Sequence, residues 1–557
     1  MDINIFKIVQ DYTNFYESEK DDLIQLKDFI TNEKDIYNSK NPIGHLTASG
    51  YIYAKEDKKI LLLAHKKLNR LLQPGGHAEP TDTSLLNTAI REIYEETQLE
   101  NLELLNIFPD KNIPFDINTH FIPENPKKDM PAHYHHDFRY LFIVEKSTNI
   151  NIDFNESNNY QWIPIKDLET DFHFKRIIDK IYKILNTDFK VPRYYSKILE
   201  KFNIDLTAYS SIVVSHIIPD CLHYLDSLNF ACPISMLIPK PNSINLEILD
   251  KIKTKYPIRQ ITRNDIANSD EINNFINSSK KPIIIFDIGG YFAEYIKRNP
   301  KSSKKIKFII EDTENGYQKY EKVNTNIPIL SVARSILKEN EDYLVGESVV
   351  FSAEVLMREV GKIIKYRKCG IIGFGKIGFS IGMTLLNKGV KPMVYDINPI
   401  KQLEAFNRMC DIETKDNLLK NADVLFLATG NHSLDIRDFR NLRNGTFVFS
   451  VTSSDDEIDS KYLESEYTVK QVHPHIYKYE NGCNYFYLIR KGNAVNFIHN
   501  AVMDNFIHLV RSEMIVGANL LNTDSHLDKS NPIFEVDIET KKEISKIWIN
   551  IFENSNY

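Results

Sequence analysis

The stretch KCGIIGFGKIG, residues 368–378, decides the fold of the C-terminal half of this 557-residue chain. Its apolar start predicts a buried strand, and Gly373, Gly375 and Gly378 predict a tight turn that opens directly into a helix. Strand-like and helix-like segments continue to alternate as far as Thr429. This alternation is typical of a parallel sheet covered by helices, so we expect an α/β fold.

The glycine spacing G-x-G-x-x-G gains weight from the acid that follows it. Asp396 closes an apolar segment 18 positions after Gly378. In dinucleotide-binding folds the glycines let a pyrophosphate approach the helix N-terminus, and the acid binds the ribose hydroxyls. Because Asp396 would repel a 2'-phosphate, we expect NAD rather than NADP.

A second motif, REIYEE at residues 91–96, belongs to a different kind of site. Glu92, Glu95 and Glu96 are three and four positions apart, so a helix places them along one face. A solvated acidic helix face is one interpretation. The other is a site for magnesium or manganese, which prefer oxygen ligands. The glycine turn PGGHAEP at residues 74–80 favours the metal site.

The region around these residues resembles the Nudix hydrolase box, G-x5-E-x7-R-E-U-x-E-E-x-G-U, and the resemblance covers roughly residues 1–185. Asp82 stands where the box has its first Glu, and Gln98 where it has Gly. The resemblance implies a Mg- or Mn-dependent diphosphate hydrolase in which Arg91 is a structural salt-bridge partner. It implies the metal ligands Glu92, Glu95 and Glu96, of which Glu95 and Glu96 are also the expected catalytic residues.

The segment HYHHDFRY, residues 133–140, also resembles the flank of that family's motif. Two interpretations of His133, His135 and Asp137 stay open. They contact the substrate, or they are strand residues that pack beside the site.

From about Ser196 to the C-terminus the chain resembles S-adenosylhomocysteine hydrolase. The resemblance is carried by EDTENG (311–316), DINPI (396–400), ATGN (428–431) and GNAVN (492–496). In that family a tightly held NAD transiently oxidises the ribose 3'-hydroxyl of the substrate. The implied cofactor contacts are Gly373, Gly375, Lys376, Ile377, Gly378, Asp396, Thr429, Gly430, Asn431, Thr313 and Asn496.

The same resemblance implies catalytic residues. Lys338 and Asp342 match the Lys and Asp at the 3'-hydroxyl, and His216 matches the catalytic histidine. Their alternatives are a surface i,i+4 ion pair for the first two and a core histidine for the third. Asp287 is displaced by one residue from the family's C4' base, so it either compensates or is structural.

Two departures concern the substrate. Ser453 replaces a substrate-site histidine of that family, and its C-terminal Lys and Tyr tail is not recognisable at residues 552–557. Adenosylhomocysteine itself is therefore not the substrate we expect.

Composition excludes several classes of partner. The net charge of −7 leaves no basic footprint for nucleic acid, and no apolar run approaches the roughly 18 residues of a membrane span. The five cysteines are scattered and form no C-x-x-C pair, as in reduced proteins. We expect a cytoplasmic homo-oligomer that acts on a small nucleotide-type substrate, without nucleic acid or membrane partners.

We expect a Nudix α/β/α sandwich at residues 1–185, a linker at 186–192, a substrate-type domain at 196–345 completed by 505–557, and a Rossmann NAD domain at 346–504. The predicted protein is bifunctional in nucleotide metabolism: it hydrolyses a nucleoside-diphosphate-linked compound and performs NAD-dependent chemistry on a ribosyl group. In the alternative, the C-terminal part binds NAD only as a sensor or oligomerisation module.

Overall fold

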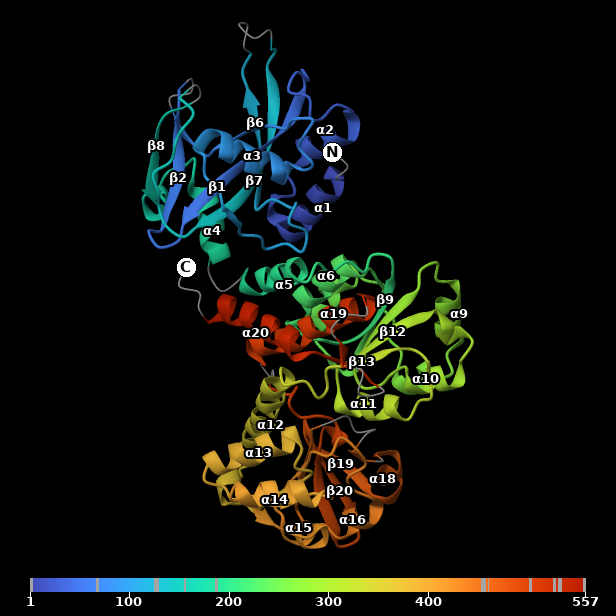
Figure 1. Ribbon diagram of the computed structural model, residues 1–557. Helices are drawn as coiled ribbons and strands as arrows, with labels where there is room; N and C mark the ends of the chain where they lie inside the picture. Colours follow the sequence, from blue (N-terminus) through green and yellow to red (C-terminus); the bar gives the residue numbers. More distant parts are fainter. Residues whose placement is uncertain are drawn as a thin grey trace. The chain divides into compact units, whose positions relative to one another are not determined.

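The structure is a computed structural model, shown in Figure 1. It describes residues 4–66, 70–124, 130–154, 157–185, 189–451, 457–458, 460–499, 503–523, 527–528 and 533–553. The described parts of residues 1–203 and 547–557 form one compact unit, called unit 1 below, and those of residues 204–546 form the other, unit 2. No described helix is both long and apolar enough to cross a membrane.

Unit 1 is built on one sheet with the order β3-β2-β1-β7-β5, to which β4, β6 and β8 add at β1, β7 and β2. The two central strands, β1 and β7, run parallel over their whole shared length. The strands are β1 (Gly44–Ala54), β2 (Lys59–His65), β3 (Arg70–Leu72), β4 (Gly75–His77), β5 (Glu103–Leu104), β6 (Asp116–Ile122), β7 (His133–Val144) and β8 (Ser157–Pro164).

Helices cover both faces of this sheet. A side chain at Gly50 would collide with Ile93, so Gly50 faces α3. The preceding residue, Ser49, pairs with Arg139, which in turn pairs with Asp116. Asp116 binds Lys180 of α4. Because neighbouring strand residues point to opposite faces, α3 and α4 lie on opposite sides. The helices are α1 (Ile5–Phe15), α2 (Ile24–Asn32), α3 (Leu85–Thr97), α4 (Lys175–Leu185) and α5 (Lys190–Lys201).

Unit 2 begins with a five-stranded, all-parallel sheet in the order β10-β9-β11-β12-β13. Its middle strand, β11, is apolar except for its last residue, Asp287, as expected for a sheet buried on both faces. The strands are β9 (Ser210–Ile217), β10 (Ile234–Ile244), β11 (Ile283–Asp287), β12 (Ile306–Glu311) and β13 (Ile329–Ser331). The helices are α6 (Cys221–Ala231), α7 (Leu246–Ile252), α8 (Arg263–Ile266), α9 (Asp270–Ser278), α10 (Ala293–Arg298) and α11 (Glu314–Glu321).

An eight-stranded sheet follows, in the order β16-β15-β14-β17-β18-β21-β20-β19. It is parallel from β16 to β21 and ends in antiparallel strands. The strands are β14 (Cys369–Ile372), β15 (Met393–Tyr395), β16 (Asp411–Ile412), β17 (Val424–Leu427), β18 (Phe447–Ser450), β19 (Thr468–His473), β20 (Ile476–Asn481) and β21 (Asn484–Ile489). The helices are α13 (Lys376–Asn387), α14 (Pro399–Asn407), α15 (Lys415–Asn421), α16 (Ile436–Arg440) and α18 (Ser460–Glu466).

Helix α12 (Lys338–Glu359) leads from the first sheet of unit 2 to the second and packs on α13, where Gly346 lies against Ser380. After the second sheet the chain returns to the first. Gly517 of α19 (Ile507–Thr523) lies against Leu330 of β13. The remaining elements are β22 (Leu527–Asp528), β23 (Glu535–Val536) and α20 (Ile538–Phe552).

The expected α/β fold class is confirmed by this architecture. The predicted linker at residues 186–192 is wrong in part. Residues 190–192 belong to α5, whose apolar side chains such as Ile198 are buried, and residues 186–188 lie outside the described residues. The finer domain limits stay predictions.

Candidate functional sites

The carboxylates of REIYEE stand on the second half of α3. The helix begins after Ser84, whose hydroxyl accepts a hydrogen bond from Asn87 N at 3.1 Å, and ends at Gln98 in a left-handed conformation. Such caps satisfy backbone groups that a helix end leaves open. The local sequence therefore sets where this helix starts and stops, and with it the face that carries the glutamates.

Arg91 holds this face together. Its Nε and Nη2 atoms bind both oxygens of Asp82 at 3.1 and 3.0 Å, and Nη2 also donates to the His77 carbonyl at 2.8 Å. Its Nη1 atom lies 3.0 Å from Glu92 Oε1 and 3.1 Å from Glu95 Oε2. Asp82, which departs from the family box, thus anchors the arginine. Arg91 has the orienting salt bridges predicted for it.

The glycine turn is shaped to receive the glutamates. Gly75 N donates to Glu96 Oε2 at 3.2 Å, and a Cβ at Gly76 would stand 2.6 Å from the Glu92 carboxylate. Any side chain at Gly76 would therefore displace Glu92. A set of carboxylate oxygens against a glycine turn fits magnesium or manganese, which take oxygen ligands.

The three glutamates differ in environment. Glu96 is buried, whereas the Glu95 side chain is 53% exposed. Glu92 and Glu95 meet at the Arg91 guanidinium, but among the described residues the three glutamates do not form a group with ligand atoms within 4.8 Å of one another. Their role as metal ligands stays a prediction.

His133 and His135 of HYHHDFRY lie on the sheet face opposite α3. His135 pairs in register with His45 of β1, and His133, two residues earlier, lies on the same face. Burial, followed by the neighbouring histidines, lowers the pKa of His45 to about 3 and that of His135 to about 2. Asp137 accepts hydrogen bonds from Thr47, Ser49, Gln73 and Arg139. Asp137 is thus engaged in packing the sheet.

The loop of residues 373–378 takes the shape expected of a phosphate cradle. Gly373 has a φ of +92°, and a Cβ at Gly378 would overlap the Gly373 carbonyl oxygen. A Cβ at Gly375 would meet no atom within 4 Å. Helix α13 begins with Lys376 and Ile377, and no side chain caps its N-terminus. Backbone N–H groups at such an end favour an anion.

Asp396 stands at the end of β15, beside this loop. Its Oδ2 accepts from Phe374 N at 2.6 Å and its Oδ1 from Asn398 N at 2.7 Å. The carboxylate is therefore tied to the glycine loop, as a ribose-binding acid requires.

The other predicted cofactor contacts come from both sheets of unit 2. The N–H groups of Thr429 and Gly430 donate to Glu457 Oε1 at 3.0 and 2.8 Å, and Asn431 bonds Gln318. Thr313 caps α11. The Asn496 Oδ1 atom is buried and has no hydrogen-bond partner among the described residues. A buried acceptor without a partner fits a site in which a bound ligand donates the missing hydrogen bond.

Lys338, at the start of α12, is buried among acids. Its Nζ lies 2.9 Å from Asp312 Oδ1 and 3.1 Å from Glu341 Oε2. Burial would lower the pKa of Lys338, but Asp312, Glu341 and Asp342 together raise it well above its ordinary value. Burial raises the pKa of Glu341 to about 7. The surface ion pair considered above is therefore wrong for Lys338.

Asp342 connects this cluster to the glycine loop. Its Oδ2 lies 3.7 Å from the Nζ of Lys376, which also donates to the Ala333 carbonyl at 3.3 Å. Burial raises the pKa of Asp342. Two predicted catalytic residues and one predicted cofactor residue thus meet in one place.

His216 ends β9, where its Nδ1 bonds the Ser243 hydroxyl and its ring lies 5.0 Å from that of Phe497. Burial, with Lys240, Arg511 and Lys338 nearby, lowers its pKa well below the ordinary value. The structure therefore places a neutral histidine within the electrostatic reach of Lys338.

Asp287 has a structural role. Its carboxylate accepts from Ile288 N at 2.8 Å and Phe292 N at 3.1 Å, and from the Tyr320 hydroxyl. It is fully buried. Of the two interpretations left open, the packing one accounts for these contacts. Ser453 lies outside the described residues, as do residues 554–557.

Sequence reasoning missed three acids near these residues: Asp312, Glu341 and Glu457. The first was visible as the acid before Thr313 in EDTENG, and the second lies one helical turn from Lys338. No local signal marks Glu457, because its partners Thr429 and Gly430 lie nearly 30 positions away.

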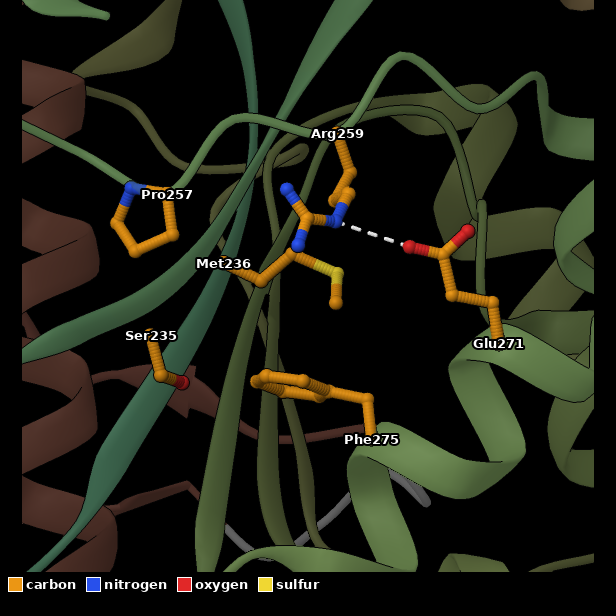
Figure 2. Close-up of a pocket in the computed structure, with 6 residues that line it drawn as sticks. All are labelled: Ser235, Met236, Pro257, Arg259, Glu271 and Phe275. Carbon is orange, nitrogen blue, oxygen red and sulfur yellow. Dashed lines mark hydrogen bonds and ion pairs between the residues drawn. The ribbon is translucent and has the colours of Figure 1, made fainter. Parts of the chain in front are cut away.

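One cavity lies apart from all these residues. It has a volume of about 150 Å³ and is lined by side chains of the five-stranded part of unit 2, with the Arg259–Glu271 ion pair (2.9 Å) on one side (Figure 2). None of the predicted site residues lines it. Its lining residues are Ser235, Met236, Pro257, Arg259, Glu271 and Phe275.

Known proteins are similar to two different parts of this chain. Adenosylhomocysteinase of Acinetobacter baylyi is 26% identical over 247 residues, which are 40% of this chain and 52% of that protein. The chain thus spans about half the length of this curated relative.

Solved structures match parts of the chain. A NUDIX-family hydrolase of Clostridium perfringens is 28% identical over 26% of this chain and 96% of its own, with a TM-score of 0.20. A D-isomer specific 2-hydroxyacid dehydrogenase of Lactobacillus delbrueckii, in its NAD complex, is 14% identical over 46% of this chain and 75% of its own, with a TM-score of 0.27.

Family models match the chain in two places. The NUDIX domain model matches residues 44–183, which hold α3 and its glutamates. The model of the NAD-binding domain of S-adenosyl-L-homocysteine hydrolase matches residues 342–502, which hold the glycine loop and Asp396. Both resemblances seen in the sequence are confirmed: the chain carries a NUDIX domain of the hydrolase family and an NAD-binding domain of the S-adenosyl-L-homocysteine hydrolase family.

Proposed function

We propose that unit 1 hydrolyses a nucleoside-diphosphate-linked compound with the help of magnesium or manganese. The observation that carries this proposal is the arrangement of Glu92 and Glu95 around Arg91, with the Glu92 carboxylate packed directly against the glycine turn at Gly76. Carboxylate oxygens gathered in this way are the donors that a hard cation requires.

In this proposal Glu92, Glu95 and Glu96 hold the metal ion. A bound divalent ion neutralises diphosphate charge and lowers the pKa of a water molecule. Arg91 orients the helix face through Asp82 and balances the glutamate charges. Glu95, the most exposed of the three carboxylates, is the best placed to accept a proton from the attacking water.

Glu95→Gln tests this assignment, because it removes a ligand charge with little change in volume. We expect magnesium-dependent hydrolysis of a panel of nucleoside-diphosphate-linked compounds to fall by about 100-fold or more, in line with the contribution of general-base catalysis. The measurement is the rate of product release by liquid chromatography.

The matched control is Glu100→Gln, an exposed glutamate just beyond α3. It should hydrolyse the panel at the wild-type rate. Equal rates for wild type and Glu95→Gln would refute the proposed metal site.

We further propose that unit 2 performs NAD-dependent chemistry on a ribosyl group. The carrying observation is that Lys338, Asp342 and Lys376 meet between the start of α12 and the glycine loop. A buried lysine surrounded by carboxylates beside a dinucleotide cradle is a candidate for proton transfer, because burial and charge partners tune the pKa values of such groups.

In this proposal the glycine loop and Asp396 bind NAD, which when bound accepts and returns a hydride. Lys338, kept protonated by the carboxylates around it, donates a hydrogen bond to the ribose 3'-oxygen, Asp342 takes the 3'-hydroxyl proton, and Asp312 holds the lysine in place. His216, neutral in its buried setting, serves as the acid or base near the leaving group at C5'.

Lys338→Met tests the catalytic role. Methionine keeps most of the side-chain stem but carries no charge and donates no hydrogen bond. In the wild type, incubation with a panel of nucleosides and thioether nucleosides should reduce bound NAD and raise the nicotinamide absorbance. The variant should lose this signal while it still binds NAD, as native mass spectrometry would show.

Lys322→Met, at an exposed lysine after α11, is the control and should respond as the wild type does. A chain that binds NAD but shows no reduction with any nucleoside would favour the sensor alternative for unit 2. Equal reduction in wild type and Lys338→Met would refute the role of the lysine.

A further inference from the structure

A group of histidines in unit 1 lies apart from the glutamates of α3. Parallel pairing of β1 and β7 sets His45 opposite His135, and His133 stands two residues earlier on β7. Residues two apart share a sheet face, so all three rings project to the same side. Thr47, on that same side, pairs with His77 of β4, whereas Gly76 faces α3. The histidines and the glutamates therefore lie on opposite faces of the sheet.

The imidazole nitrogens are close enough to share one ion. One ring nitrogen from each of His45, His133 and His135 lies within 4.8 Å of the other two. The Nε2 atoms of His133 and His135 are 3.3 Å apart. Two nitrogens at about 2.0–2.1 Å from a tetrahedral zinc ion would be about 3.4 Å apart. The observed pair already has nearly that spacing.

The tautomer of His133 suits a ligand. Its Nδ1 lies 2.8 Å from the Pro131 carbonyl oxygen, which can only accept a hydrogen bond. The proton therefore resides on Nδ1, and the Nε2 lone pair points toward His135. Histidine ligands of metals commonly donate their second N–H to a backbone carbonyl or a carboxylate in this way.

The burial of the His45 ring also points to a ligand. It is 1% exposed, yet neither ring nitrogen has a hydrogen-bond partner in the described part of the chain. A buried polar group without a partner is costly, so one is expected to have a function. A metal ion between His45 and its two neighbours would bind one of these two nitrogens.

We propose that His45, His133 and His135 form a second metal site, for a divalent transition metal ion such as zinc, held by three imidazole nitrogens. Nitrogen donors select zinc, nickel or copper over magnesium, so this site differs in chemistry from the carboxylates of α3. Three protein ligands leave a fourth position open to water or to an oxygen of a ligand.

Cobalt and zinc titrations of the metal-free full-length chain test this proposal. Excess Mg²⁺ is present throughout to occupy oxygen-ligand sites. We expect one equivalent of Co²⁺ to produce the visible absorption of a tetrahedral nitrogen site, and Zn²⁺ to remove it. His45→Gln, His133→Gln and His135→Gln should each weaken Zn²⁺ binding by more than the about 10–100-fold that loss of an outer partner costs.

His136→Gln is the matched control. It is the next residue on β7, but its ring stacks on Phe29 on the other face and its Nδ1 bonds Thr119. It should bind Zn²⁺ as the wild type does, and so should Glu95→Gln, which removes only a ligand proposed for magnesium. Binding lost in Glu95→Gln and kept in His135→Gln would overturn the site.

X-ray absorption of the zinc-loaded wild type needs no variant, and it decides the case if a histidine variant fails to fold. Three imidazole nitrogens at about 2.0–2.1 Å from zinc support the site. A shell of oxygen atoms alone, or a wild type that binds no Zn²⁺ in excess Mg²⁺, overturns it.

Discussion

At the scale of single residues, one buried acid of unit 2 has a strongly raised pKa. Glu513 of α19 is fully buried, and its Oε1 lies 3.7 Å from Lys541 Nζ. Burial raises the pKa of Glu513 from 4.5 to about 7. The folded state thus holds this proton more tightly than the unfolded chain does. The resulting stabilisation is complete below about pH 4.5 and is lost as the pH rises through about 7.

Glu513→Gln should remove this pH dependence, because glutamine stays uncharged. Relative to the variant, the wild type should lose up to about 3 kcal/mol of unfolding free energy between pH ~4.5 and pH ~8. Urea unfolding of both proteins at several pH values measures the difference. Glu539→Gln, at an exposed glutamate of α20, should parallel the wild type. A constant gap between Glu513→Gln and the wild type at every pH would contradict the raised pKa.

At the scale of helices and strands, an ion cluster attaches α4 to the sheet of unit 1. Lys180 Nζ lies 2.7 Å from Asp116 Oδ1, 2.8 Å from Glu19 Oε1 and 2.6 Å from the Tyr12 hydroxyl. Asp116 is fully buried and also binds Arg139 at 3.2 Å. The cluster thus joins the start of the chain, β6, β7 and α4.

Lys180→Met should destabilise unit 1 by about 3 kcal/mol, since it leaves Asp116 and Glu19 with less compensation in a buried site. Denaturant unfolding followed by far-UV circular dichroism measures the change. Lys175→Met, on the same helix, removes only an exposed pair with Asp179 and should cost about 0.5 kcal/mol or less. Similar losses in the two variants would show that the buried cluster contributes little.

At the scale of the whole molecule, the chain forms two compact units, and each has its own hydrophobic core. The α3 glutamates belong to the first unit, and Lys338 with the glycine loop belongs to the second. Sites built on separate cores do not need each other to keep their geometry.

The two proposed activities should therefore be separable in one chain. Glu95→Gln should keep nucleoside-driven reduction of bound NAD within about twofold of wild type, and Lys338→Met should keep hydrolysis equally well. Both assays on each full-length variant check this. Loss of both activities in either variant would instead demonstrate coupling between the units.

The sequence by itself determined the local backbone structure of both sites. The i,i+3 and i,i+4 spacing of Glu92, Glu95 and Glu96 on a helix, and the glycines at 373 and 378, depend only on backbone geometry within a few residues. For the same reason the strand β14 lies where the apolar start of residues 368–378 predicts it.

Only the tertiary structure decided which distant side chains meet. Lys338 forms ion pairs with Asp312, 26 positions earlier, and with Glu341. His45 meets His135 through the register of two parallel strands that lie 90 positions apart. In β1 polar His45, Thr47 and Ser49 alternate with apolar Leu46 and Ala48. This alternation assigns each side chain to a face of the sheet but does not choose its partner on β7, because a slip of two residues keeps every side chain on its face. Packing of the complete sheet specifies the register instead, and with it the histidine group.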